Sequence, residues 1–258
     1  MRIQQFIVLV LFVLCANAPV RAESGLVVAA ASSLRGLWPA LMQSYTDHSG
    51  APAPRVSFGS SGLLSTQILN GAPFHIFLSA DLASVKRLPS GMLREAPQIF
   101  AHGELSVVVP KSSVLTGSLS NDSLAETILK DAESDGLRIA IPNPIHAPYG
   151  KAAREALMFA RIWPMAAGQL LSAENASQTM QFVKSGVVAA AVVPTVLLAG
   201  QSVGFASVKL PPESYQPIEH VLAILQTAGA SADNFAHWLM GEDARNLLED
   251  SGLRVSVQ

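Results

Sequence analysis

Residues 70–81 read NGAPFHIFLSAD, a pattern typical of the end of a helix, a short strand and the start of a second helix. Gly71 is suited to end a helix, because glycine adopts a left-handed backbone without steric cost. Ile76–Ser79 has the length and apolar character of a buried strand, and Asp81 then offers a side-chain oxygen to cap the next helix. The stretch therefore predicts one unit of an α/β fold.

The two preceding stretches have the same order, a short strand followed by serines at the start of a helix. Leu26–Ala30 precedes Ser32 and Ser33, either of which fits the N-cap, and Arg55–Phe58 precedes Ser60-Ser61-Gly62. Apolar runs that alternate with amphipathic runs in this way predict α/β layers around parallel sheets.

The rest of the chain predicts a second domain and a return to the first. Pro39 falls inside the first helix and is expected to bend it, because proline removes one amide and crowds the preceding turn. The first domain is expected to comprise residues 23–104 and 222–258, and the second residues 105–221. The further predicted elements are strands at Leu105–Pro110, Arg138–Ile141, Val187–Val193 and Ile218–Leu225, and helices at Lys151–Ile162, from Asn175 and from Ser231.

Residues 1–22 have the pattern of a secretory signal peptide. Arg2 precedes an apolar run from Phe6 to Ala16, which is too short to span a bilayer, and a small-x-small site ends at Ala22. Cleavage after Ala22 is favoured over cleavage after Ala18. Either cut removes Cys15, the only cysteine, so the mature protein is expected to be periplasmic, without disulfide or thiol chemistry.

The charge of the chain excludes one class of partner. Without Arg2 and Arg21, 15 basic residues stand against 19 acidic ones, which gives a formal charge of −4. An acidic chain without basic clusters is a poor binder of nucleic acid.

The predicted strand ends point to an anion as the ligand. Ser32-Ser33, Ser60-Ser61 and Asn175 each stand at a predicted helix start, and Pro148-Tyr149-Gly150 offers a glycine at a fourth. Ligands of open α/β sheets bind outside the carboxyl ends of the strands, where helix N-termini present unpaired amides. Any one of these serines can be only a cap, but their repetition in both halves favours a shared site.

Four stretches together resemble the ligand loops of the periplasmic molybdate-binding proteins, the substrate-binding components of ABC transporters. The stretches are AAASSL at 29–34, FGSSGL at 58–63 followed by residues 70–81, NPIHAPYGKAA at 143–153, and AENA at 173–176. The resemblance covers essentially all of residues 23–258. It implies an α/β fold of the two-domain type II periplasmic binding protein, with two crossover strands as hinge.

The resemblance also implies a ligand set and partners. Ser33, with Ser32 beside it, and Ser61 would donate through hydroxyl and amide, and Tyr149 and Ala176 through backbone amides. The Tyr149 hydroxyl is a further candidate donor. The ligand would be molybdate or tungstate, with molybdenum present only as the oxyanion, no cofactor, and the permease of an ABC importer as partner of a monomeric protein.

Some features depart from the family pattern, and other functions stay open. His75 stands where an acidic residue is expected, and Val193-Pro194-Thr195 is unusual. A protein of the same fold that binds sulfate or phosphate is the nearer alternative. A serine hydrolase is the more distant one, because Ser61 has glycines nearby but the chain has no Gly-x-Ser-x-Gly frame, and an enzyme is therefore not expected.

Overall fold

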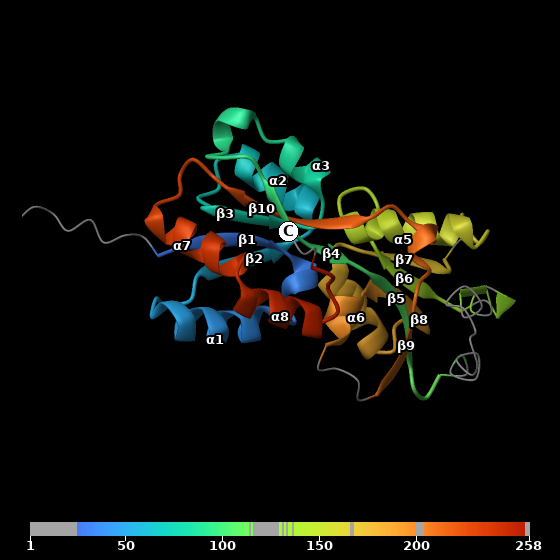
Figure 1. Ribbon diagram of the computed structural model, residues 1–258. Helices are drawn as coiled ribbons and strands as arrows, with labels where there is room; N and C mark the ends of the chain where they lie inside the picture. Colours follow the sequence, from blue (N-terminus) through green and yellow to red (C-terminus); the bar gives the residue numbers. More distant parts are fainter. Residues whose placement is uncertain are drawn as a thin grey trace, which may run out of the picture.

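The computed structural model describes residues 25–113, 115, 129–130, 132, 134–135, 137–165, 168–199 and 204–255. The predicted signal peptide at 1–22, including Cys15, lies outside these residues. The described chain forms two five-stranded sheets, each with helices on both faces, which lie side by side in Figure 1. None of the described helices is long and apolar enough to cross a membrane.

The first sheet contains the strands from both ends of the chain. Its order is β2 (Arg55–Gly59), β1 (Val27–Ala31), β3 (Ile76–Ser79), β10 (Ile218–Ile224) and β4 (Gln98–Gly103). Strand β1 is parallel to β2 and β3, whereas β10 is antiparallel to β3 and β4. The prediction of parallel sheets was therefore only partly right, because a strand that returns from the other domain enters this sheet in the opposite direction.

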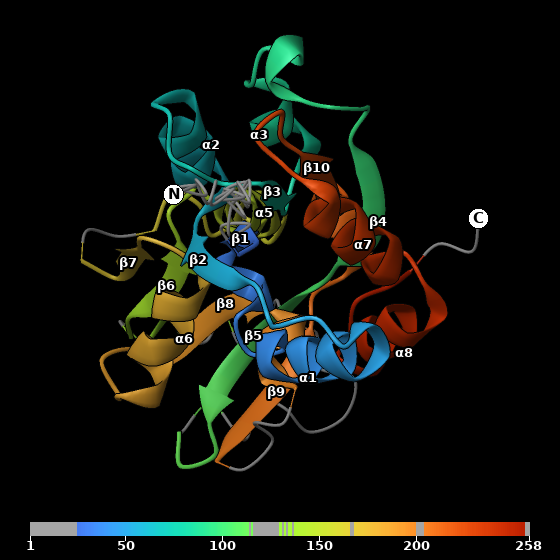
Figure 2. The same ribbon diagram turned by 90° about the vertical axis from the view of Figure 1, so that its left-hand side faces the viewer.

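Five helices cover the first sheet. Figure 2 shows α2 and α3 on one side of β1 and β3, and α1 and α8 on the other. Two separate apolar clusters follow from this arrangement, one beneath α1, α7 and α8 and one beneath α2 and α3. The helices are α1 (Trp38–Ser49), α2 (Ser61–Leu69), α3 (Leu82–Lys86), α7 (Ala230–Leu239) and α8 (Glu242–Asp250).

The second sheet repeats this plan in the middle of the chain. Its order is β7 (Leu170–Ala173), β6 (Ile139–Pro142), β8 (Ala190–Pro194), β5 (Leu105–Pro110) and β9 (Phe205–Lys209). Strand β6 is parallel to β7 and β8, and β5 is antiparallel to β8 and β9. Helix α5 (Pro148–Phe159) packs in one apolar cluster and α6 (Ala176–Lys184) in the other.

The two sheets are joined where β4 passes into β5 and where the chain returns into β10. Glu104, between β4 and β5, is held by Lys209 Nζ at 2.6 Å and by Arg254 Nε at 3.3 Å. Strand β10 pairs with β4 from Ile218 onward, so the expected boundary between residues 221 and 222 falls inside this strand. The crossings are thus fixed by strand pairing and by ion pairs from both sides.

Two helix starts differ from the sequence prediction by three residues or more, and proline explains both. Helix α1 begins at Trp38, so Pro39 lies in its first turn, where the missing amide costs nothing, and the predicted bend is wrong. Helix α5 likewise begins at Pro148, earlier than the predicted Lys151, because proline also fits the first turn of that helix. Neither Ser32 nor Ser33 caps α1, because both belong to a separate 3₁₀ turn at Ser32–Leu34.

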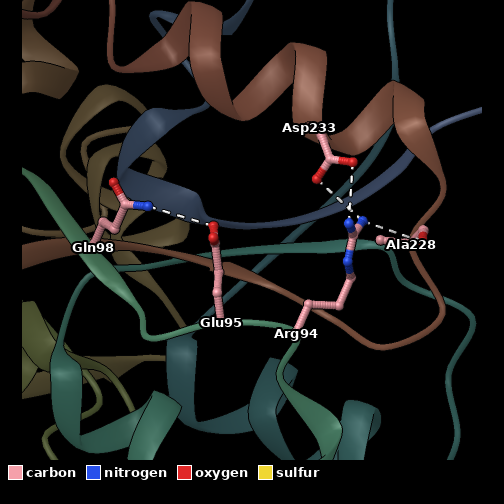
Figure 3. A network of polar contacts seen from close by, with 5 residues as sticks. All are labelled: Arg94, Glu95, Gln98, Ala228 and Asp233. Carbon is pink, nitrogen blue, oxygen red and sulfur yellow. Dashed lines mark hydrogen bonds and ion pairs between the residues drawn. The ribbon is translucent and has the colours of Figure 1, made fainter.

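Local polar contacts fix several of the connections. Asp81 accepts a hydrogen bond from the Ser84 amide at 2.9 Å and caps α3, as predicted. Figure 3 shows the Arg94 guanidinium facing the Asp233 carboxylate of α7, with Gln98 bonded to Glu95 beside it. The Arg94 and Asp233 side chains form an ion pair at 3.1 Å. The cap satisfies an otherwise unpaired amide, whereas the ion pair is partly exposed to solvent.

Substitution of Asp81 and of Arg94 should show how much the helix cap and the ion pair each contribute to stability. We expect Asp81→Ala to lower the free energy of unfolding by about 1 kcal/mol, because the first turn of α3 loses its cap. Arg94→Ala is expected to cost less than about 0.5 kcal/mol, because solvent screens the pair that it removes. Urea unfolding measures both, and equal losses would contradict this assignment.

Candidate functional site

One cavity lies between the two sheets and is lined by all five residues of the predicted site. The space between its lining atoms is about 200 Å³, part of which is open to solvent. The lining residues are Ala31, Ser32, Ser33, Gly59, Ser60, Ser61, Ala80, Ala147, Pro148, Tyr149 and Ala176.

The strand ends explain why these residues meet. Ser32 directly follows β1, and Ser61 begins the helix that follows β2. In the second domain Tyr149 lies in the helix after β6, and Ala176 begins the helix after β7. The carboxyl ends of parallel strands share one edge of a sheet, and the two sheets turn these edges toward each other across the cavity.

Ser61 is fully buried, and its hydroxyl has a defined direction. Its Oγ accepts a hydrogen bond from the Ala80 amide at 2.9 Å, just after β3. Because that bond occupies a lone pair and leaves the hydroxyl hydrogen unused, Ser61 can donate into the cavity.

Ser33 is buried and has an unsatisfied hydroxyl. No hydrogen-bond partner of normal geometry reaches its Oγ among the described residues. Ser32 contacts the other domain instead, because its carbonyl oxygen accepts from Ser177 Oγ at 2.8 Å. Both serines border the cavity, and Ser33 carries the free donor.

Two helices of the second domain begin at the cavity wall. Tyr149 is the second residue of α5 and Ala176 the first of α6, so their amides belong to first turns that lack intrahelical acceptors. Asn175 caps α6 through its side chain, as predicted, by accepting from the Gln178 amide at 3.1 Å. The helix dipoles add partial positive charge at the same points.

The Tyr149 side chain reaches away from α5 toward the domain crossing. Its hydroxyl lies 2.8 Å from Nε2 of His220 on β10, and both residues are buried. Burial raises the pKa of Tyr149 above its ordinary value and lowers the pKa of His220 to about 3, with His102 contributing to the second shift. Both side chains are therefore neutral at neutral pH. Sequence reasoning missed His220, because no local motif marks it.

The two domains also touch directly beside the cavity. The Gly62 amide donates to the His146 carbonyl oxygen at 3.0 Å, and Ser60 Oγ lies 2.8 Å from His146 Nδ1. A Cβ on Gly62 would meet that carbonyl oxygen at 2.7 Å, so only glycine permits this approach. His146 thus joins the two domains beside the cavity.

The remaining departures from the family pattern have structural roles. His75 Nδ1 accepts from the Val27 amide at 3.1 Å and so supports the start of β1. Thr195 Oγ1 pairs with Ser106 Oγ at 2.8 Å, away from the lining of the cavity. Among the described residues, no group of three or more His, Cys, Asp or Glu could hold a metal ion.

The chain is similar to known proteins over most of its length. Residues 26–254 match the family described as bacterial extracellular solute-binding protein. The molybdate-binding protein ModA of Rhodobacter capsulatus is 27% identical over 198 residues, covering 76% of this chain and 75% of that protein. The Escherichia coli ModA is 26% identical over 243 residues, 90% of each chain. The structure of the Azotobacter vinelandii periplasmic molybdate-binding protein superposes with a TM-score of 0.79 at 26% identity, covering 90% of this chain and all of that one.

The contact between Gly62 and His146 can be tested by hydrogen exchange. Gly62 is the second residue of α2, so its amide has no acceptor in its own helix and is protected only by His146. Gly62→Ala should speed exchange of the amide at position 62 by about tenfold or more, as expected for one lost hydrogen bond. Gly36→Ala is the matched control, because its added Cβ would meet only Leu197 at 3.9 Å. Unchanged protection in the Gly62 variant would refute the contact.

Proposed function

Because the chain belongs to the bacterial extracellular solute-binding proteins, we propose that it captures molybdate or tungstate in the cavity between its two domains. The relatives named as molybdate-binding proteins match this chain over 75% or more of their own length. These relatives and the similar solved structure support the choice of ligand.

The observation that carries the proposal is a cavity of neutral donors supplied by both domains. No charged side chain is among its lining residues, whereas the lining includes serine hydroxyls and two helix starts. A buried hydrogen bond to a charged group contributes about 1.5–3 kcal/mol. About six such bonds gross roughly 10–20 kcal/mol before ordering costs, and nanomolar affinity needs about 12 kcal/mol.

The same donors determine which anions fit. Hydrogen-bond donors directed into the cavity favour a fully deprotonated oxyanion over one that must donate a proton itself. Phosphate near neutral pH carries such a proton, so the cavity disfavours it. Sulfate carries none, and cavity size must separate it from the larger molybdate.

We propose that the protein works as the periplasmic component of an ABC importer. The signal peptide predicted at 1–22 would direct it across the inner membrane, and the permease of the importer would be its partner. Domain closure over the anion would mark the loaded protein, which acts as a monomer without a cofactor.

The contact between Ser60 and His146 near the cavity is also consistent with binding without catalysis. Ser60 Oγ lies 2.8 Å from His146 Nδ1, but no described carboxylate is hydrogen-bonded to that imidazole. A serine nucleophile needs a base that a third group orients. The pair joins the domains, and the serine hydrolase alternative has no other support.

Ser61 is the residue whose loss should affect binding most directly. We expect Ser61→Ala to weaken molybdate binding by about 1–3 kcal/mol, because a buried donor to a dianion is removed. Ser65→Ala is the matched control, since Ser65 is buried one turn further along α2 and its hydroxyl lies outside the cavity lining. Calorimetry on both variants measures the difference. Equal affinities for molybdate would remove Ser61 from the site.

An anion series tests the choice of ligand itself. Titration of the mature protein, freed of bound anion, should show tight one-to-one binding of molybdate and tungstate. Sulfate and phosphate should bind at least about a hundredfold more weakly, equivalent to about 2.7 kcal/mol. Tight sulfate binding without molybdate binding would instead identify a sulfate receptor of the same fold.

A further inference from the structure

The pair formed by Tyr149 and His220 links the cavity to the domain crossing. Tyr149 belongs to α5 of the second domain and lines the cavity, while His220 belongs to β10, the returning crossover strand. Gly103, at the end of β4, makes room for the pair, because a Cβ there would overlap the Tyr149 hydroxyl. Helix α5, strand β10 and the end of strand β4 therefore all take part in accommodating this hydrogen bond.

That hydrogen bond can run in either direction. Tyr149 can donate to Nε2, which leaves the hydrogen of His220 on Nδ1, or Nε2–H can donate to the tyrosine oxygen. His220 Nδ1 is buried and has no hydrogen-bond partner among the described groups. The first direction therefore buries an unpaired N–H, and the second leaves only an unpaired lone pair, the milder of the two defects.

The surroundings of Tyr149 on the side of the cavity also favour donation from His220 Nε2–H to the tyrosine oxygen. Burial raises the pKa of Tyr149, and the neighbouring Ser33 hydroxyl opposes part of that rise, although it forms no hydrogen bond of normal geometry. If Tyr149 donated to His220, its lone pairs would face the region of Ser33 and repel an anion. If Tyr149 accepts from His220, its hydrogen is free to point toward the cavity.

We propose that His220 is a positioning residue of the anion site, which donates Nε2–H to Tyr149 and so directs the tyrosine hydroxyl hydrogen toward the bound oxyanion. This inference rests on the proposed function, because the freed tyrosine hydrogen needs an anion in the cavity to accept it. It adds a further donor to the serines and helix amides, and this donor is in place only when α5 lies against β10. His220 thereby ties the composition of the donor set to domain closure.

The direction of the bond has a direct readout in the wild-type protein. With molybdate bound, nitrogen NMR of histidine-labelled protein should show His220 protonated at Nε2 and unprotonated at Nδ1. The opposite tautomer would overturn the proposal. This measurement needs no substitution and so does not depend on the folding of any variant.

Affinity measurements test the consequence. His220→Leu and Tyr149→Phe should each weaken molybdate binding about tenfold, and the double variant should bind no more weakly than Tyr149→Phe alone. His220→Gln should stay within about threefold of wild type, because its side-chain amide can also donate to the tyrosine. Additive losses, or wild-type affinity in His220→Leu, would refute the positioning role.

A neighbouring substitution controls for simple damage to the strand. Val221→Ala changes the next residue of β10, which packs in the apolar cluster of the first sheet beneath α2 and α3. It should lower the unfolding temperature while leaving the molybdate affinity within about twofold of wild type. If wild-type protein itself binds no molybdate, the proposed function fails. Tight wild-type binding that His220→Leu leaves unchanged refutes only the role of His220.

Discussion

The arrangement of the cavity depends on desolvation. An anion that loses its water must find replacement donors already in place, because an unpaired charge in a buried site is very costly. The two sheets meet this constraint by ending their parallel strands at facing edges, where hydroxyls and first-turn amides are unpaired. The facing edges of the two sheets are kept in place by the chain crossings, by the glycines at close approaches and by the fixed serine hydroxyl.

The sequence was most informative where structure depends on neighbours in the chain. Asp81 and Asn175 cap their helices as predicted, because a cap joins residues only three apart. The strand at Ile76–Ser79 was also predicted with its observed bounds. Pro39 was interpreted wrongly, because a proline bends a helix only when it lies beyond the first turn, and helix starts are poorly marked in sequence.

The contacts between domains could not be predicted in the same way. His146 meets Ser60, and His220 meets Tyr149, across 86 and 71 positions of the chain. No periodic pattern records such pairs, since they depend on how one domain rests on the other. Resemblance nominated five lining residues because each follows a strand within a recognisable loop, whereas Gly103 and His220 lie in strands whose sequence is merely apolar or mixed.

The neutral lining of the cavity has an electrical consequence. Because no cationic side chain borders it, nothing in the wall offsets the charge of a bound oxyanion except dipoles. The closed protein with its ligand and the closed protein without it then share one shape but differ by the whole charge of the ion. The membrane partner that we propose would therefore meet a difference in field between these two closed forms, and could use it to distinguish a loaded protein from an empty one.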